Sequence, residues 1–273
     1  MNTPPELRAA VSAPAEPPNR LFAASLCLTD VLVLTYLVPV AKVASLIPTG
    51  FAPDVLPDAE GELCALVQTT AAFCEEARLS FAPKGSGESY REITYRVLGR
   101  ATKNEPGAYV LRSFYTADAV YLAHRAVEKN ADFARATVHI SGNPVAGSFG
   151  GYRLRTVADC GTTEWDTATI TEEDAEAINA PFGNFGDMTR FLLRRTALYF
   201  APVAPVRGWQ GLSPLTLPAE LPVATPVRLL SARLTPWREW GVLTAEAALL
   251  PQSVLYLPSL AVSAYAPRPV KLS

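Results

Sequence analysis

The chain has 273 residues, of which 49% are hydrophobic and 18% are charged. It is therefore long enough to bury a core and too apolar to be disordered throughout. Its net charge of −2 lacks the basic excess of a nucleic-acid-binding protein, and its 24 prolines against 16 glycines argue against a helical bundle, because proline breaks a helix interior. These numbers favour a β-rich fold with many turns.

Four cysteines occur in the chain: Cys27, Cys64, Cys74 and Cys160. None is paired as Cys-x-x-Cys, and only two histidines are present, so a zinc site would need scattered ligands. A chain of this size does not need disulfides, which favours free thiols, a reducing compartment and a cytoplasmic location. We expect Cys27 and Cys64 to be small core residues, and we expect no metal and no cofactor.

The beginning of the chain predicts an arm followed by one domain. Five prolines among residues 1–18 predict a disordered arm, and residues 19–273 show no internal repeat or linker. The start lacks the basic and apolar regions of a signal peptide. Residues 21–40 are apolar, but Asp30 near their middle would cost about 2.5–3.5 kcal/mol in a bilayer, so residues 31–37 predict a buried strand and not a membrane span.

The first half of the domain predicts strands joined by short elements. Prolines bound a short helix over 39–48, an apolar run predicts a strand over 63–73, and the charged residues 75–88 predict a loop. Residues 90–98 alternate, with Glu92, Thr94 and Arg96 on one face and Ile93 and Tyr95 on the other. With a strand over 108–115, they form a long hairpin.

The second half predicts helices mixed with strands. Thr116 predicts the cap of a helix over 117–127, and a glycine-rich turn joins strands over 134–140 and 152–157. That turn lacks the GxGxxG pattern of a dinucleotide site. A short acidic helix starts at Thr171, and Asp187 caps a longer one that continues to Tyr199. Six prolines in 202–226 predict a surface connector, and the last strands are expected over 228–234, 240–249 and 254–264.

Three stretches together resemble the acetoacetate decarboxylase-like superfamily. Residues 34–39 and 46–53 are similar to its opening strand, short helix and L-x-P-x-x-x-x-P turn. Residues 89–92 resemble its Tyr-x-Glu strand, and 191–199 resemble an F-L-x-x-R-x-x-L-Y helix. That helix belongs to a bacterial branch whose members mostly lack the decarboxylase lysine. The resemblance runs from about residue 20 to residue 265.

The resemblance implies a mainly β, single-domain fold: an antiparallel conical β-barrel with a few flanking helices and a buried apolar pocket. In the decarboxylases a lysine forms a Schiff base with the ketone of a β-keto acid, and a second lysine and the apolar surroundings lower its pKa.

The chain departs from that pattern where the reactive lysines are expected. Residues 124–133 contain no adjacent lysine pair, and Asp132 or a neighbour stands at the lysine position. Lys129 is the only lysine nearby, and Leu37 replaces a charged residue of the decarboxylases. Glu92 is retained and matches an acidic residue that lines the decarboxylase pocket.

Glu92 is the first candidate for a functional residue. On an inward face it would be desolvated, with a raised pKa, and usable as an acid, base or hydrogen-bond acceptor. On an outward face it would pair with Arg91 or Arg96. His124 and Arg125 are candidates to assist it, although a core histidine and a surface arginine are the alternatives.

Six further residues are candidates to line the pocket. The acidic neighbours of Lys129 should raise its pKa, which is the opposite of activation for a Schiff base. The tyrosines suit an apolar pocket or a core equally well. The predicted ligand-binding residues are Tyr36, Gln68, Arg112, Tyr115, Tyr121 and Lys129.

The sequence leaves three functions open. The first is a barrel that binds, and can transform, a small apolar molecule bearing a keto or carboxyl group without Schiff-base chemistry. The second is a non-catalytic ligand-binding or structural barrel, and the third is a decarboxylase or aldolase that uses Lys129. The enzyme class implied is a lyase, but without the lysine pair the sequence does not decide whether the chain is an enzyme. Expected partners are a small-molecule ligand, no nucleic acid and no membrane; a homo-oligomer stays open.

Overall fold

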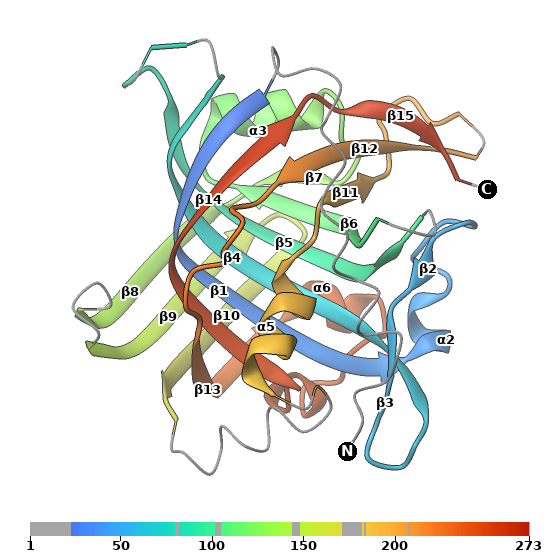
Figure 1. Ribbon diagram of the computed structural model, residues 1–273, viewed down its shortest axis with the longest axis vertical. Helices are drawn as coiled ribbons and strands as arrows, with labels where there is room; N and C mark the ends of the chain where they lie inside the picture. The colour runs from blue at the N-terminus through green and yellow to red at the C-terminus, as the bar shows by residue number, and fades with distance from the viewer. Residues whose placement is uncertain are drawn as a thin grey trace.

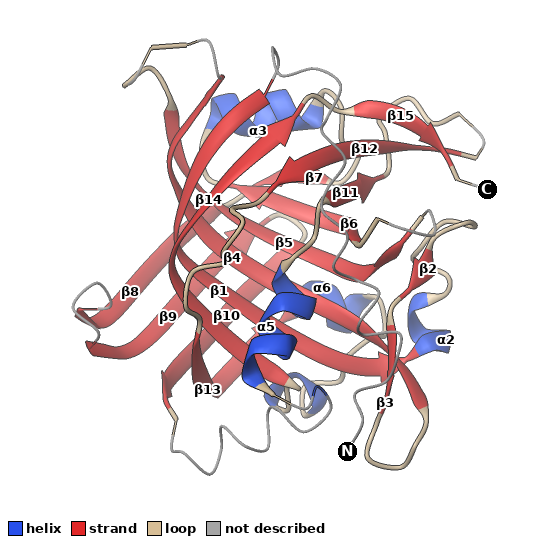
Figure 2. Ribbon diagram, in the orientation of Figure 1, coloured by secondary structure: helices blue, strands red, loops and turns tan. Residues whose placement is uncertain are grey.

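The computed structural model describes residues 23–79, 82–83, 85–101, 105–143, 148–170, 182, 184–206 and 208–272. The expected arm over 1–18 and the acidic helix from Thr171 lie outside these residues. Strands dominate the described fold, as Figure 2 shows, so the predicted mainly β class is confirmed. Among the described residues no helix is long and apolar enough to cross a membrane.

The strands and helices have the following bounds. The strands are β1 (Ala23–Pro39), β2 (Ala52–Pro53), β3 (Val55–Pro57), β4 (Leu63–Leu79), β5 (Glu88–Arg100), β6 (Gly107–Tyr115), β7 (Ala131–Phe133), β8 (Arg135–Asn143), β9 (Ser148–Ala158), β10 (Gly161–Thr169), β11 (Ala197–Phe200), β12 (Trp209–Thr216), β13 (Thr225–Leu234), β14 (Ser253–Tyr265) and β15 (Arg268–Lys271). The helices are α2 (Val40–Val43), α3 (Asp118–Arg125), α5 (Phe185–Leu193), α6 (Thr235–Glu239) and the 3-10 turn η4 (Ala247–Leu249).

The central strands form a ring. Each of β12, β11, β6, β5, β4, β1 and β14 pairs with the next in this order. Strand β12 also pairs with β14 at Leu215↔Ala264 and Thr216↔Ser263, which joins the two ends of the row. Strands β13, β10, β9 and β8 continue outward from β14, while α3 lies at one end of the ring and α5 lies across its other half (Figure 1).

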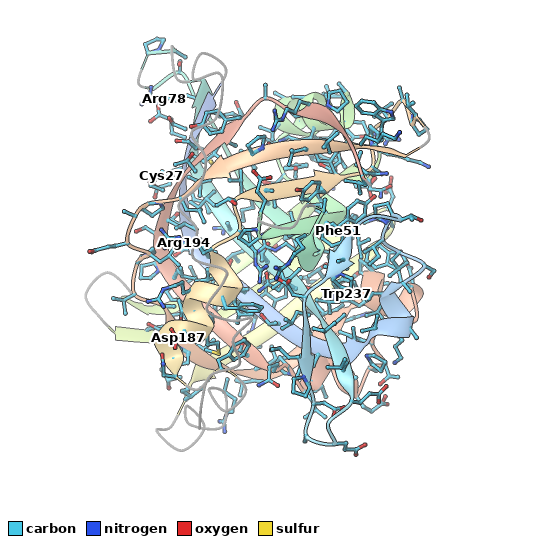
Figure 3. The ribbon with its side chains drawn as sticks, turned by 45° about the vertical axis from the view of Figure 1, so that its right-hand side comes forward. Cys27, Phe51, Arg78, Asp187, Arg194 and Trp237 are labelled. Carbon is cyan, nitrogen blue, oxygen red and sulfur yellow. The ribbon has the colours of Figure 1, made fainter. Side chains whose placement is uncertain are left out.

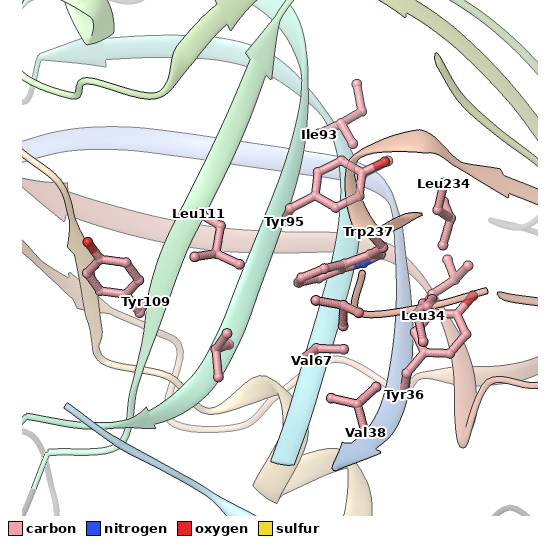
Figure 4. Close-up of a cluster of buried hydrophobic side chains, with 14 of the residues drawn as sticks. Leu34, Tyr36, Val38, Val67, Ile93, Tyr95, Tyr109, Leu111, Leu234 and Trp237 are labelled. Atoms are coloured by element: carbon pink, nitrogen blue, oxygen red, sulfur yellow. The ribbon is translucent and has the colours of Figure 1, made fainter. Parts of the chain in front are cut away.

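Alternation along the strands separates two cores. The outer core joins the ring to β8–β10, β13 and α6, and there Trp237 donates a 2.7 Å hydrogen bond to Thr69 and packs edge-on against Tyr95 (Figure 4). The inner core lies on the opposite face, where α5 covers the ring. It contains Val31, Val33, Leu66, Leu98, Met188, Leu192, Leu255 and Leu257. The ring interior is therefore largely apolar.

Asp30 interrupts β1 as a bulge. It is the single described non-glycine residue with a positive φ, 50°, and the register with β4 shifts between Thr29 and Leu32. The Tyr256 hydroxyl donates a 3.0 Å hydrogen bond to its carboxylate. The extra residue lets Leu28 and Val31 both face the inner core, so this charge fits within an apolar strand. The predicted strand over 31–37 is confirmed and is longer than expected.

A buried ion pair fastens the end of α5 to the ring. Arg195 donates a 2.5 Å hydrogen bond to Asp54, and their side chains are 3% and 4% exposed. Arg100 contacts the other carboxylate oxygen of Asp54 at 3.0 Å, and Arg195 also donates to the carbonyl of Phe191 at 2.7 Å. Because Asp54 lies between β2 and β3, these bonds hold helix, loop and strand together.

Several predicted elements are wrong in the second half of the chain. Residues 240–249 form turns and η4, not a strand, because Trp240 and Ala247 pack on the outer core from α6 and its exit. The long helix ends at Leu193, and the expected helical residue Tyr199 lies in β11, which pairs in parallel with β6. Apolar residues spaced for a helix there belong to two elements.

Other local predictions need smaller corrections. The expected loop over 75–88 is partly strand, since β4 runs to Leu79 and β5 starts at Glu88. The expected connector over 202–226 contains β12, whose Gly211 and Pro214 still permit pairing with β11.

Two predicted helix caps are also wrong. The Thr116 hydroxyl accepts a bond from the Arg91 amide and does not cap α3, and Asn184, not Asp187, caps α5.

The prediction of free thiols is confirmed, but the predicted core position of Cys27 is wrong. All four cysteines are free. Cys64 is buried, but Cys27 is exposed at the surface (Figure 3), since it precedes Leu32, the first residue of β1 in the outer core.

We predict that Gly99→Ala lowers the free energy of unfolding by about 1–3 kcal/mol, the usual cost of overpacking. A Cβ at Gly99 would lie 2.3 Å from the carbonyl oxygen of Ala52 and 2.8 Å from Cα of Pro53, so backbone would have to move. Chemical denaturation measures the loss. Gly186→Ala, whose Cβ would meet only an Asn184 side-chain atom at 3.4 Å, is the matched control; equal stability of both variants would contradict the expectation.

Candidate functional site

A row of polar side chains crosses the apolar interior of the ring. On β5 the inward residues are Glu92, Thr94 and Arg96, as the alternation predicts. Their partners across β4 are Ala72, Thr70 and Gln68, and across β6 Glu92 faces Tyr115 and Thr94 faces Ser113. The hydroxyls of Thr70 and Thr94 are hydrogen-bonded to each other. This row defines the candidate site.

Arg96 is the cation of the site, and an amide holds it in place. Its Nε and Nη2 donate bonds of 3.0 and 2.8 Å to the side-chain oxygen of Gln68. The Gln68 amide nitrogen in turn donates to Thr35 at 3.1 Å and to the carbonyl of Leu192 at 3.4 Å. Burial lowers the pKa of Arg96 to about 10, and the like charge of Arg195 adds to this, while Glu92 opposes it. Arg96 still carries a positive charge at neutral pH.

Glu92 is half-buried, and its carboxylate accepts no hydrogen bond from the described residues. Burial raises its pKa above the ordinary value of 4.5; the charge of His124 lowers it, that of Glu128 raises it further, and that of Arg96 lowers it. The predicted direction of this shift is confirmed. A carboxyl group with no hydrogen-bond partner and a raised pKa keeps its proton to a higher pH than an ordinary glutamate, which suits it to acid–base chemistry.

Glu128 is a second interior carboxylate, which the sequence analysis missed. It lies just after α3, and its side chain is 6% exposed. Ser113 donates a 3.0 Å hydrogen bond to its Oε1, and Nδ1 of His124 lies 3.7 Å from its Oε2. The exit of α3 pairs with Pro202, which turns Glu128 inward. This pairing depends on a segment distant in sequence, so no local pattern could have indicated it.

His124 connects this carboxylate to a tyrosine and to the surface. Its ring stacks on Tyr115 with centroids 4.2 Å apart, and the Tyr115 hydroxyl is hydrogen-bonded to its Nδ1 at 2.8 Å. The His124 side chain is 40% exposed. Burial and the charges of Glu92 and Glu128 raise the pKa of Tyr115 well above its ordinary value, so its hydroxyl keeps its proton.

The structure brings together four of the predicted site residues, namely Glu92, His124, Gln68 and Tyr115. Tyr121 is half-buried beside them on α3, against Phe133.

Two predicted ligand-binding residues lie on the outer face. The Tyr36 hydroxyl donates to the carbonyl of Ala248 at 2.8 Å, and Tyr36 is 1% exposed within the outer core. Arg112 lies over the ring of Trp240, 3.6 Å from Asp132. Strand alternation places both side chains opposite Glu92.

Two other predicted residues are exposed. Arg125 donates to the carbonyl of Lys129, and both side chains face solvent after α3. Asp132, aligned with the family lysine, lies 3.6 Å from Arg112 on the outer face. The whole chain has five lysines, and the three that the structure describes, Lys42, Lys129 and Lys271, are exposed.

Within the described part of the chain, no group of three or more His, Cys, Asp or Glu side chains could hold a metal ion. The side chains that the site offers are two carboxyl groups, one guanidinium, hydroxyls and an imidazole.

The comparison with solved structures identifies the fold. An acetoacetate decarboxylase-like enzyme from Sphingomonas wittichii RW1 superposes with a TM-score of 0.59 at 11% identity, over 92% of this chain and 93% of that one. The chain has the acetoacetate decarboxylase-like fold. The enduracididine biosynthesis enzyme MppR complexed with pyruvate gives 0.57 at 12% identity, covering 96% and 93%. The acetoacetate decarboxylase from Legionella pneumophila subsp. pneumophila str. Philadelphia 1 gives 0.56 at 11%, also covering 96% and 93%.

No family model and no curated protein sequence matches the chain. The predicted resemblance in fold is thus confirmed by structure, whereas the lysine-lacking branch, the single domain over 19–273 and the roles of the site residues stay predictions.

We predict that Glu92→Gln is at least as stable as the wild type at pH 7. Because the folded-state pKa of Glu92 is raised, the folded protein holds this proton to a higher pH than the unfolded chain does. Wild-type stability therefore falls as pH rises from about 4.5 through the raised pKa, and glutamine removes that loss.

Thermal melts of both proteins between pH 4 and 8 test this. The advantage of the variant should vanish at the acidic end, where Glu92 is protonated in both states. A variant that is clearly less stable at pH 7 would show that Glu92 is a structural ion-pair residue.

Proposed function

We propose that the ring interior binds a small apolar molecule bearing a keto or carboxyl group and transforms it by acid–base chemistry, without a Schiff base. Arg96 holds the ligand carboxylate, and Glu92 is the polar anchor at the keto oxygen, with His124 assisting. A small α-keto acid fits this arrangement best. The observation that carries the proposal is the pair of Glu92 and Arg96 on one inward face of β5.

The chemistry of the two groups supports this ligand class. A planar guanidinium binds a carboxylate through two parallel hydrogen bonds, and Gln68 occupies Nε and Nη2 of Arg96, which leaves its other N–H groups for a ligand. A protonated Glu92 can donate to a keto oxygen. The aliphatic side chains of Val33, Leu198 and Leu255 surround the row and favour an apolar body.

The distribution of lysines supports chemistry without an imine. A Schiff-base lysine needs an apolar or cationic setting that lowers its pKa, but Lys129 is exposed beside Glu128 and its backbone is tied to Ala201. MppR, which has this fold, has been solved in complex with pyruvate and with the condensation product of pyruvate and imidazole 4-carboxaldehyde. These complexes support a keto acid as the first probe for this chain.

We predict that 2-oxobutanoate and pyruvate bind the wild type, and that Arg96→Gln weakens binding roughly 10- to 100-fold, the cost of one charge-assisted contact. Isothermal titration calorimetry measures both. Arg153→Gln, at an exposed arginine on β9 paired with Asp166, is the matched control and should bind as the wild type does. Unchanged affinity of Arg96→Gln would contradict the carboxylate site.

The same titration separates the proposal from a non-catalytic structural barrel. A barrel filled by its own side chains would bind neither acid in any variant.

We predict that sodium borohydride added with acetoacetate leaves the protein mass unchanged. Reduction traps an imine as a stable amine adduct, and no described lysine is buried near Glu92. Intact-mass spectrometry reads the result. An adduct mapped to Lys129 would instead support the lysine-dependent decarboxylase or aldolase.

A further inference from the structure

Glu128, His124 and Tyr115 form a continuous polar path from the ring interior to the surface. Glu128 is 6% exposed and His124 is 40% exposed, and the two groups approach to 3.7 Å. The amide of Glu128 donates to the carbonyl of His124 at 2.7 Å, so the end of α3 fixes their spacing. A buried carboxylate next to a part-exposed imidazole is an arrangement suited to moving protons.

We infer that Glu128 takes a proton from the carbon next to the keto group of the ligand, and that His124 exchanges this proton with solvent. The inference rests on the proposed function, since it assumes a keto acid held by Arg96 and Glu92. Both carboxyl groups lie beside Tyr115: Glu92 is its partner across the β5–β6 pair, and Glu128 is bonded to Ser113, two residues earlier on the same face of β6. We therefore place the ligand between them.

The two carboxyl groups have different hydrogen-bond partners, and we assign them different roles on that basis. Glu92 accepts no hydrogen bond from the described residues, so its proton can face the keto oxygen. Glu128 accepts from Ser113 on Oε1, which leaves Oε2 beside Nδ1 of His124. The charged and titratable groups around them are Cys74 from β4, Arg96 and Tyr90 from β5, Tyr109 and Tyr115 from β6, and His124 from α3.

The step balances without any further reactant. The C–H bond next to the keto carbon breaks, its electron pair forms the C=C bond of an enolate, and the proton forms an O–H bond on Glu128. The negative charge on the former keto oxygen is held by the proton of Glu92 and by Arg96. His124 passes the proton outward and returns another from water, and the reverse step places it on carbon.

Proton exchange into 2-oxobutanoate in D2O tests the inference. Proton NMR follows loss of the signal from the CH2 group next to the keto carbon. We expect the wild type to accelerate this loss over the uncatalysed rate, and Glu128→Gln to reduce the protein-dependent rate roughly 100-fold or more while the Kd stays near the wild-type value. Glu128→Asp, which keeps the carboxylate but withdraws it, should exchange at an intermediate rate.

Rescue distinguishes proton transfer by His124 from a structural role. His124→Ala should lose exchange, and imidazole added to the solution should restore it, because the site is open to solvent at this side chain. Leu122→Ala, at a 63% exposed residue of the same helix, is the control and should exchange as the wild type does.

The outcomes distinguish failure of the inference from failure of the proposed function. Exchange at the wild-type rate in Glu128→Gln would overturn the inference and leave the proposed function intact. If His124→Ala loses exchange and imidazole does not restore it, the proposed role of His124 in proton transfer is overturned, and the proposed function again stays intact. A wild type that binds 2-oxobutanoate without accelerating exchange would overturn the inference and the acid–base part of the proposal. A wild type that binds neither keto acid would overturn the proposed function itself.

Discussion

An arginine inside an apolar ring is the constraint on which the site depends. Burying a guanidinium without partners is very costly, so its N–H groups must be satisfied. Here Gln68 supplies the acceptor, and its own amide is held by Thr35 and by the carbonyl of Leu192. The chain of bonds crosses β5, β4 and β1 and reaches α5, so the charge is fixed only where strand register and helix docking are both correct.

The site also depends on the position of α5, which Arg195 anchors. Arg195 lies just after the helix and donates hydrogen bonds to Asp54 and to the carbonyl of Phe191. Removing one partner of a buried ion pair typically lowers the stability of a protein by about 3–5 kcal/mol. A shift of α5 would withdraw Leu192 from Gln68 and loosen Arg96. The buried Arg195 and the part-buried Arg96 therefore both depend on the position of α5, although only Arg96 belongs to the candidate site.

Strand alternation made the inward-facing residues of β5 predictable from the sequence. Contacts between segments that are distant in the sequence could not be predicted in this way. Glu92 and Arg96 face inward as the two-residue period of a strand predicts, and the predicted fold class and resemblance in fold were also correct. Glu128 was missed because its inward turn depends on pairing with Pro202, seventy-four positions later in the numbering. The strand predicted over 240–249 was wrong because an apolar run of residues is as compatible with a buried turn as with a strand.

Glu128 offers a physical explanation for the absence of paired lysines from residues 124–133. An apolar or cationic setting lowers the pKa of a lysine. A carboxylate next to the lysine would instead stabilise its ammonium form and suppress its attack on a ketone. The interior end of α3 instead holds a carboxylate, an imidazole and a hydroxyl within one set of contacts. Such groups transfer protons without a covalent intermediate, which is why we propose enolisation and not imine formation for this site. In this proposal the apolar ring supplies the low dielectric that both chemistries need, and the carboxylate beside the ligand is what disfavours the imine.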